Sequence, residues 1–122
     1  MQTEIVDLYE YFGLKRQDGA SGYLTTYIHN QSKEFCVGRI RPAMLVIPGG
    51  AYRVVSEREG EPVAISFLEK GYNSFVLTYS VAPVSFPSQL IEGAMAMAYI
   101  RENAETFNIF RDKIGAVGFS AG

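Results

Sequence analysis

The final ten residues, 113–122, constrain the fold more than any other stretch of this sequence. A run with almost no charge leads into the pentapeptide Gly118-Phe119-Ser120-Ala121-Gly122. Glycines on both sides of a central serine are typical of a very tight turn between a strand and a helix, where neighbouring backbones pass close by and dihedral angles are strained. The pattern therefore predicts a strand that ends in a sharp turn, with the serine hydroxyl held in the open. An ordinary glycine-rich turn is the alternative.

A second apolar run, Ala43 to Ile47, stops at Pro48-Gly49-Gly50-Ala51-Tyr52. This composition is typical of a buried strand followed by a loop with minimal side chains. Such a loop can present backbone N–H groups to a negatively charged oxygen, as acyl transfer requires. An ordinary turn is again the alternative, because Pro-Gly-Gly is common in turns. Two such signals, each directly after an apolar strand, favour a shared site.

The N-terminal third of the sequence carries weaker signals. Residues 1–20 are expected to form an arm on the body of the protein or a short amphipathic helix. Alternating threonine, tyrosine and aliphatic residues predict an edge strand over Tyr23–His29. A polar turn over 30–33 and a further short strand over 34–38 follow.

The later segments alternate between helix and strand. Ser56 and Glu59 have the spacing of a capping box, and a helix over 62–70 is expected to stop at Gly71. The stretch 74–79 predicts a buried strand, and a longer helix begins at Ser88. Its apolar stripe, expected to face the sheet, consists of Leu90, Ile91, Ala94, Met95 and Ala98. Apolar strands that alternate with helices predict an α/β fold with a mostly parallel sheet and crossover helices.

Composition and charge exclude several classes of protein. Eleven basic and thirteen acidic residues give a net charge of −2 without a basic stripe, so we expect no nucleic-acid partner. The single cysteine, Cys36, is expected to be a small buried hydrophobe. Glu4 and Asp7 stand where a signal peptide would carry lysines, and no run approaches the ~20 apolar residues of a membrane span. We therefore expect a cytoplasmic protein that does not bind membranes.

Four blocks of the sequence match one known family: 46–52, 56–64, 75–83 and 114–122. Through them, the chain from about Tyr23 onward resembles the N-terminal half of an α/β hydrolase of the esterase/lipase type, close to the acetyl-esterase and carbohydrate-esterase-like group. Many relatives have His-Gly-Gly-Gly where this chain has Pro-Gly-Gly-Ala, but the family role of that loop is carried by backbone N–H groups. The resemblance implies one incomplete α/β-hydrolase domain over 1–122, with an arm over 1–20 and the sheet and helices over 21–122.

The resemblance also implies roles for single residues. Ser120 would be the nucleophile, and the backbone N–H groups of Gly50, Ala51 and Ala121 would form the oxyanion hole. The glycines that would shape the loop and the turn are Gly49, Gly118 and Gly122. The implied reaction is hydrolysis of a small-molecule ester through an acyl-serine intermediate, with no metal or cofactor. Short acyl groups are favoured, such as acetyl on a carbohydrate, and peptidase or amidase activity on the same scaffold stays open.

A serine hydrolase also needs a histidine base and a carboxylate that orients it. The only histidine, His29, precedes the serine, whereas the family places it after; we expect an exposed histidine at a strand end, not a base. The chain is therefore predicted to be a portion truncated after the nucleophile turn, and inactive in isolation. The alternative is a non-catalytic interaction module that forms homo-oligomers through an exposed sheet edge. A nucleotide-binding domain is disfavoured, because no phosphate-binding glycine motif follows a strand.

Overall fold

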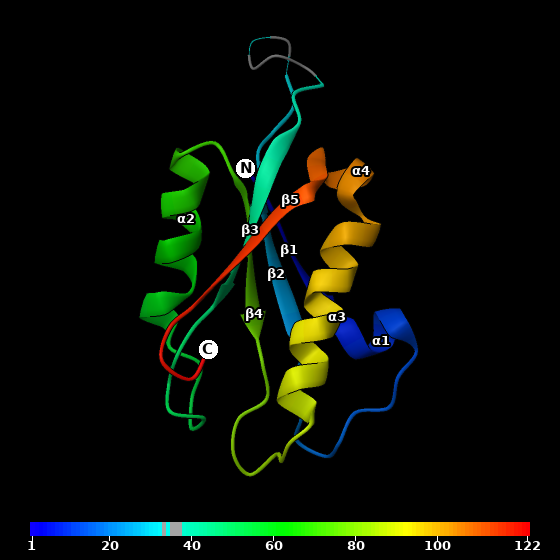
Figure 1. Cartoon of the computed structure of the whole chain (residues 1–122), viewed down its shortest axis with the longest axis vertical. Helices are drawn as coiled ribbons and strands as arrows, with labels where there is room; N and C mark the ends of the chain where they lie inside the picture. The colour runs from blue at the N-terminus through cyan, green and yellow to red at the C-terminus, as the bar shows by residue number, and fades with distance from the viewer. Residues whose placement is uncertain (33, 35–37) are drawn as a thin grey trace.

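One five-stranded sheet runs through the molecule, with the strand order β1-β2-β4-β3-β5 (Figure 1). The computed structural model describes residues 1–32, 34 and 38–122. The strands are β1 (Gln2–Asp7), β2 (Tyr23–Ile28), β3 (Arg41–Ile47), β4 (Asn73–Thr78) and β5 (Ile109–Gly118). Strands β4, β3 and β5 are parallel, whereas β1 and β2 are antiparallel to their neighbours. The predicted α/β class is confirmed, and the sheet is mixed.

Helices cover both faces of this sheet (Figure 1). They are α1 (Leu8–Phe12), α2 (Glu61–Glu69), α3 (Ser88–Glu102) and α4 (Ala104–Phe107), and the 3-10 turn η2 (Glu57–Glu59) precedes α2. Helix α2 lies on one face, and α1, α3 and α4 lie on the other. The larger core, which includes Phe75, Leu77 and Ile100, fills the α3 side, and a smaller one around Val46 and Leu68 fills the α2 side. In the described part of the chain, no helix is long and apolar enough to cross a membrane.

The N-terminal residues form a strand that the sequence analysis missed. All six residues of β1 pair with β2, from Gln2 opposite Ile28 to Asp7 opposite Tyr23. Because β1 lies at the sheet edge and most of its side chains are exposed, it lacks the buried alternation that marks a half-buried strand. The short helix that was expected within residues 1–20 is present as α1, which covers only Leu8–Phe12. Since β1 takes the edge, the prediction that Tyr23–His29 is an edge strand is wrong, and β2 lies inside the sheet.

Helix α3 begins at Ser88 as predicted, but it buries a different face. Leu90 is 64% exposed and Ile91 is 40% exposed, so the predicted stripe is wrong except at Met95, which is buried. The buried residues of α3 are Ser88, Glu92, Met95, Ala96, Tyr99 and Ile100. The reason is a buried carboxylate: Glu92 accepts hydrogen bonds from the Tyr9 hydroxyl and from the N–H and hydroxyl of Ser80. A charged residue is not a core residue in any apolar pattern.

The predicted helix over 62–70 is confirmed as α2, although its start differs from the prediction. Pro62 lies in the first turn, and the backbone turns left-handed at Gly71 after the helix has ended at Glu69. The Ser56 side chain makes no capping hydrogen bond, so the capping-box prediction is wrong. The Glu59 carboxylate instead accepts a hydrogen bond from the N–H of Gly49. The predictions for a short strand over 34–38 and for Cys36 fall on residues 35–37, outside the described part of the chain.

Candidate active site

The turn after β5 has the predicted sharp geometry. Ser120, at φ 52°, is in the left-handed region that residues with a side chain seldom adopt, and it is exposed. The turn closes through a 2.8 Å hydrogen bond from the N–H of Gly122 to the carbonyl of Phe119. The N–H of Phe119 in turn donates to the carbonyl of Ile47, at 3.1 Å, which ties the turn to the end of β3. We call residues 118–122 the serine turn.

Close backbone packing explains the two glycines of the serine turn. A Cβ atom on Gly118 would lie 2.6 Å from the carbonyl oxygen of Gly122. A Cβ atom on Gly122 would overlap the carbonyl oxygen of Ile47. Neither position has room for a side chain, as the sequence pattern predicted.

The loop after β3, residues 48–52, lies against the serine turn, and we call it the glycine loop. A Cβ atom on Gly49 would lie 3.1 Å from the Cβ of Ser120 and 2.5 Å from the carbonyl oxygen of Phe119. Gly50 has φ 144°, a backbone conformation that residues with a side chain rarely adopt, and a Cβ atom on Gly50 would overlap the carbonyl of Val54. The two segments that sequence analysis grouped into one site are therefore neighbours, about seventy residues apart in the chain.

The hydrogen bonds of the glycine loop set the direction of its N–H groups. The carbonyl of Gly49 accepts from the N–H of Ser56 at 2.9 Å, and the carbonyl of Gly50 accepts from the N–H of Arg53 at 3.0 Å. In a trans peptide the N–H points away from the carbonyl of the same unit, so the N–H groups of Gly50 and Ala51 point away from these partners. Among the described residues, no acceptor bonds to either N–H or to that of Ala121. Free backbone N–H groups of this kind can bind a negatively charged oxygen.

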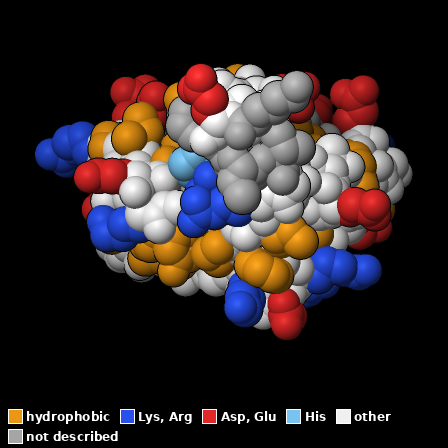
Figure 2. Space-filling view, turned by 90° about the horizontal axis from the view of Figure 1, so that it is seen from above, with side chains coloured by type: hydrophobic (Ala, Val, Ile, Leu, Met, Phe, Trp, Pro, Cys, Tyr) orange, Lys and Arg blue, Asp and Glu red, His pale blue; other side chains and the backbone are white. Residues whose placement is uncertain are grey.

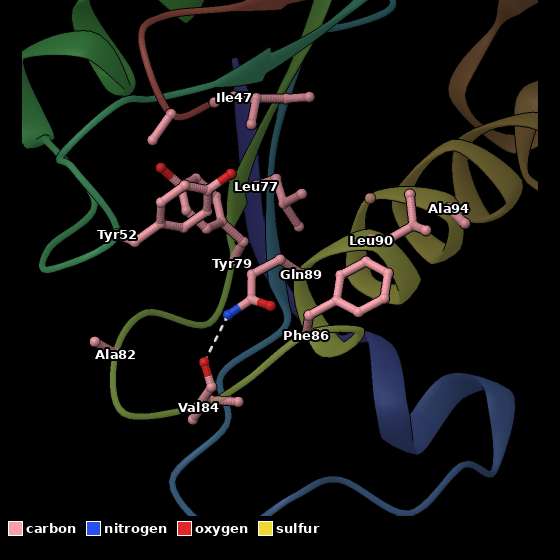
Figure 3. A pocket seen from close by; sticks show the side chains of 13 residues that line it. Ile47, Tyr52, Leu77, Tyr79, Ala82, Val84, Phe86, Gln89, Leu90 and Ala94 are labelled. Carbon is pink, nitrogen blue, oxygen red and sulfur yellow. Dashed lines mark hydrogen bonds between the residues drawn. The ribbon is translucent and has the colours of Figure 1, made fainter.

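A largely apolar cavity of about 710 Å³ adjoins the serine turn. Figure 3 shows its wall, which includes Tyr52 of the glycine loop, Tyr79 and Phe86 from the segment between β4 and α3, and Leu90 of α3. Ala121 and Gly122 also line it. Sequence analysis did not find this cavity. The apolar residues at the start of α3 were its one signal, and they were interpreted as core.

His29 lies at the opposite end of the sheet. Its N–H donates to the side chain of Asn73, the first residue of β4, whereas Ser120 follows the C-terminal end of the parallel strand β5. Figure 2 is turned from the view of Figure 1 so that the molecule is seen from above, and it shows the histidine beside basic side chains. The ring Nε2 of His29 lies 3.0 Å from the carbonyl oxygen of Leu68. Burial, together with the nearby positive charge of Arg41, lowers the pKa of His29. The expected exposed histidine is thus half-buried.

Within the part of the chain that the structure describes, no group of three or more His, Cys, Asp or Glu side chains is placed to hold a metal ion.

A parallel β4-β3-β5 core, crossover helices on both faces and a sharp turn at the C-terminal end of β5 define an α/β hydrolase, and solved structures bear out this fold. Residues 27–122 match the model of the BD-FAE family. The chain belongs to the BD-FAE family. This family is part of the α/β hydrolase superfamily, which the sequence resemblance predicted.

Three relatives illustrate the relationship. The crystal structure of MGS-M1, an α/β hydrolase enzyme from a Medee basin deep-sea metagenome library, superposes with a TM-score of 0.86 at 41% identity, covering 100% of this chain and 48% of MGS-M1. An acetyl ester-xyloside bifunctional hydrolase from Caldicellulosiruptor lactoaceticus has a TM-score of 0.80 at 28% identity, covering 97% of this chain and 43% of that one. Endo-1,4-beta-xylanase B from Butyrivibrio fibrisolvens is 39% identical over 103 residues, which are 81% of this chain and 15% of the xylanase.

These relatives establish the chain as part of a hydrolase family. The chain spans less than half the length of each of the three. The mechanism, the substrate and the partners of the whole protein are therefore matters for proposal.

Proposed function

We propose that this chain supplies the nucleophile and the oxyanion hole of a serine esterase. Ser120 attacks the carbonyl carbon of the ester, and the N–H groups of Gly50, Ala51 and Ala121 stabilise the oxyanion that forms. The observation that supports this proposal best is the contact between the two segments, in which a Cβ on Gly49 would lie 3.1 Å from the Cβ of Ser120. That contact brings the serine turn and the glycine loop side by side at the C-terminal ends of β3 and β5.

The proposed reaction has two steps. The serine oxygen forms a bond to the carbonyl carbon while its proton passes to a base, and the tetrahedral intermediate then expels the alcohol, which takes up that proton. A water molecule hydrolyses the resulting acyl-serine by the same route and releases the acid. His29 lies at the opposite end of the sheet from Ser120, so we expect the base, with the carboxylate that orients it, to come from outside these 122 residues. We expect the isolated chain to be inactive.

The substrate proposed is a short-chain ester, such as an acetyl group on a carbohydrate. The names of two relatives support it, since one acts on acetyl esters and xylosides and the other on xylan. An apolar cavity beside the serine turn suits the uncharged acyl part of such an ester. Amide or peptide hydrolysis on the same scaffold is the competing proposal, and a matched pair of ester and anilide substrates separates the two.

The test is an esterase assay on the complete gene product that carries these residues. With p-nitrophenyl acetate, we expect turnover by the parent protein and its loss in Ser120→Ala. Ser66→Ala is the matched control, because Ser66 is an exposed serine on α2 that accepts only a 3.4 Å hydrogen bond from Lys70. Full activity in Ser120→Ala would overturn the proposal. Turnover of p-nitroacetanilide in preference to the ester would favour the amidase.

A different role is suggested by the position of β5 at the sheet edge. An edge strand presents unpaired N–H and C=O groups that a second strand can join. We infer that the 122-residue chain forms a homo-oligomer through this edge when nothing else covers it. Light scattering tests this, and a monodisperse monomer at high concentration would contradict it.

A further inference from the structure

One peptide unit of the glycine loop, that between Pro48 and Gly49, is held at both ends. The hydroxyl of Tyr79 donates a 2.5 Å hydrogen bond to the carbonyl of Pro48. On the other side of the same unit, the N–H of Gly49 donates a 2.9 Å hydrogen bond to Oε1 of Glu59. The two partners come from different segments: Tyr79 directly follows β4, and Glu59 belongs to η2. Together they fix the plane of this peptide relative to the sheet.

The orientation of this unit acts together with the hydrogen bonds from Ser56 and Arg53 on the two units that follow. Gly49 has no side chain, so more backbone conformations are open to it than to other residues. A rotation here would redirect the N–H groups of Gly50 and Ala51, which are the two that are left free for a ligand. The hydrogen bonds of Pro48 and Gly49 therefore act on the direction in which the proposed oxyanion hole points.

Glu59 lies against Gly49, on which the serine turn also packs. The position that a Cβ on Gly49 would occupy lies 3.0 Å from Oε1 of Glu59 and 3.1 Å from the Cβ of Ser120. Gly49 thus separates the carboxylate from the nucleophile, and the side chain of Glu59 is half-buried. Burial is the largest cause that raises the pKa of Tyr79, and the nearby Tyr52 and Glu59 raise it further. The hydroxyl therefore stays protonated and can donate a hydrogen bond.

We propose that Glu59 is a positioning residue for the proposed ester hydrolysis, and that it works with Tyr79 to hold the glycine loop in the shape that binds the oxyanion. This inference rests on the proposed function. Glu59 is assigned no proton transfer, because it acts through the N–H of Gly49. Its contribution falls in the transition state, where the negative charge on the oxygen develops.

Two substitutions at position 59 test this role in the complete gene product. Glu59→Ala removes the acceptor, and we expect kcat for p-nitrophenyl acetate to fall about 10- to 100-fold with KM changed by less than about 3-fold. Glu59→Gln keeps an oxygen that accepts from Gly49 but cannot take up a proton, and we expect kcat within about 3-fold of the parent. Glu57→Ala is the matched control, because Glu57 is an exposed carboxylate on the same turn; we expect no change.

A second variant covers the case in which Glu59→Ala does not fold. Tyr79→Phe removes only the hydroxyl that donates to Pro48, and we expect a lower kcat with an unchanged KM. A parent-like kcat in folded Glu59→Ala would overturn the proposal, as would a parent-like kcat in Tyr79→Phe if Glu59→Ala does not fold. If Glu59→Gln is as impaired as Glu59→Ala, Glu59 takes part in proton transfer and the positioning role is wrong. Failure of the proposed function is separate: Ser120→Ala would then keep the activity.

Discussion

The hydroxyl of Tyr9 donates a 2.6 Å hydrogen bond to the carboxylate of Glu92, which is 83 positions later in the chain. Glu92 is fully buried and also accepts from the N–H of Ser80 at 2.6 Å. The hydroxyl of Ser80 accepts in turn from the N–H of Ser21. This network joins α1, the segment before β2, the loop after β4 and α3. The network lies on the same face of the sheet as the larger apolar core and links the segments that form that core.

Removing the Tyr9 hydroxyl is expected to destabilise the fold. Tyr9→Phe leaves the buried carboxylate of Glu92 with one donor fewer, which corresponds to about 1–3 kcal/mol in the free energy of unfolding. Urea titration followed by circular dichroism measures this quantity. Tyr11→Phe is the control, because the Tyr11 hydroxyl makes only a 3.2 Å hydrogen bond with Asn103 at an exposed site. There we expect a change within about 0.5 kcal/mol.

The same tyrosine predicts a loss of stability at alkaline pH. Burial, reinforced by the hydrogen bond and charge of Glu92, raises the pKa of Tyr9 from 10.0 to about 12. The raised value means that the stabilisation is complete below the pKa of the unfolded chain and is lost as the pH rises from about 10 to about 12. The difference in unfolding free energy between the parent and Tyr9→Phe should therefore narrow between about pH 8 and about pH 11. A difference that stays constant over this range would contradict the assignment.

Two glycines are expected to respond in opposite directions to alanine. At Gly50, a Cβ would overlap the carbonyl of Val54, and φ is 144°, so Gly50→Ala should lower the free energy of unfolding by about 1–3 kcal/mol. At Gly93, inside α3, a Cβ would meet nothing within 4 Å. Gly93→Ala should raise it by about 0.5–1 kcal/mol, because alanine favours the helix. Thermal unfolding of both variants measures this, and equal shifts would count against the geometry of the glycine loop.

His29 predicts a loss of stability on the acid side. Burial is the main cause that lowers its pKa from 6.5, followed by the positive charge of Arg41. A lowered value means that the stabilisation is present above the pKa of the unfolded chain and is lost as the pH falls through the folded value. His29→Gln should therefore lose less stability than the parent between about pH 7.5 and about pH 5 in urea titrations. Parallel curves for the two proteins would show that the ring does not titrate in this range.

The sequence predicted the parts of the fold that depend on local geometry. Glycines at 118 and 122 predicted a turn with no room for side chains, and the apolar run before Pro48 predicted β3. Long-range partners account for what was missed. Strand β1 exists because β2 pairs with it, and nothing in its exposed residues marks that pairing.

Long-range contacts also explain why the sequence did not predict some of the residues around the site. The buried face of α3 depends on Glu92, whose donors come from Tyr9 and Ser80. The spacing of Ser56 and Glu59 fits a helix cap, but the carboxylate bonds to Gly49, which only the tertiary structure brings near. Local patterns therefore predicted the sharp serine turn, and could not predict the side chains that hold the loop beside it.

The most direct test of the central claim is covalent labelling of Ser120. A fluorophosphonate reacts with a serine only when the hydroxyl is activated and the oxyanion hole is formed. We predict that the complete gene product is labelled, that peptide mapping by mass spectrometry places the adduct on Ser120, and that Ser120→Ala abolishes labelling while Ser66→Ala does not. Absence of label in active protein, or an adduct on another serine, would contradict the account.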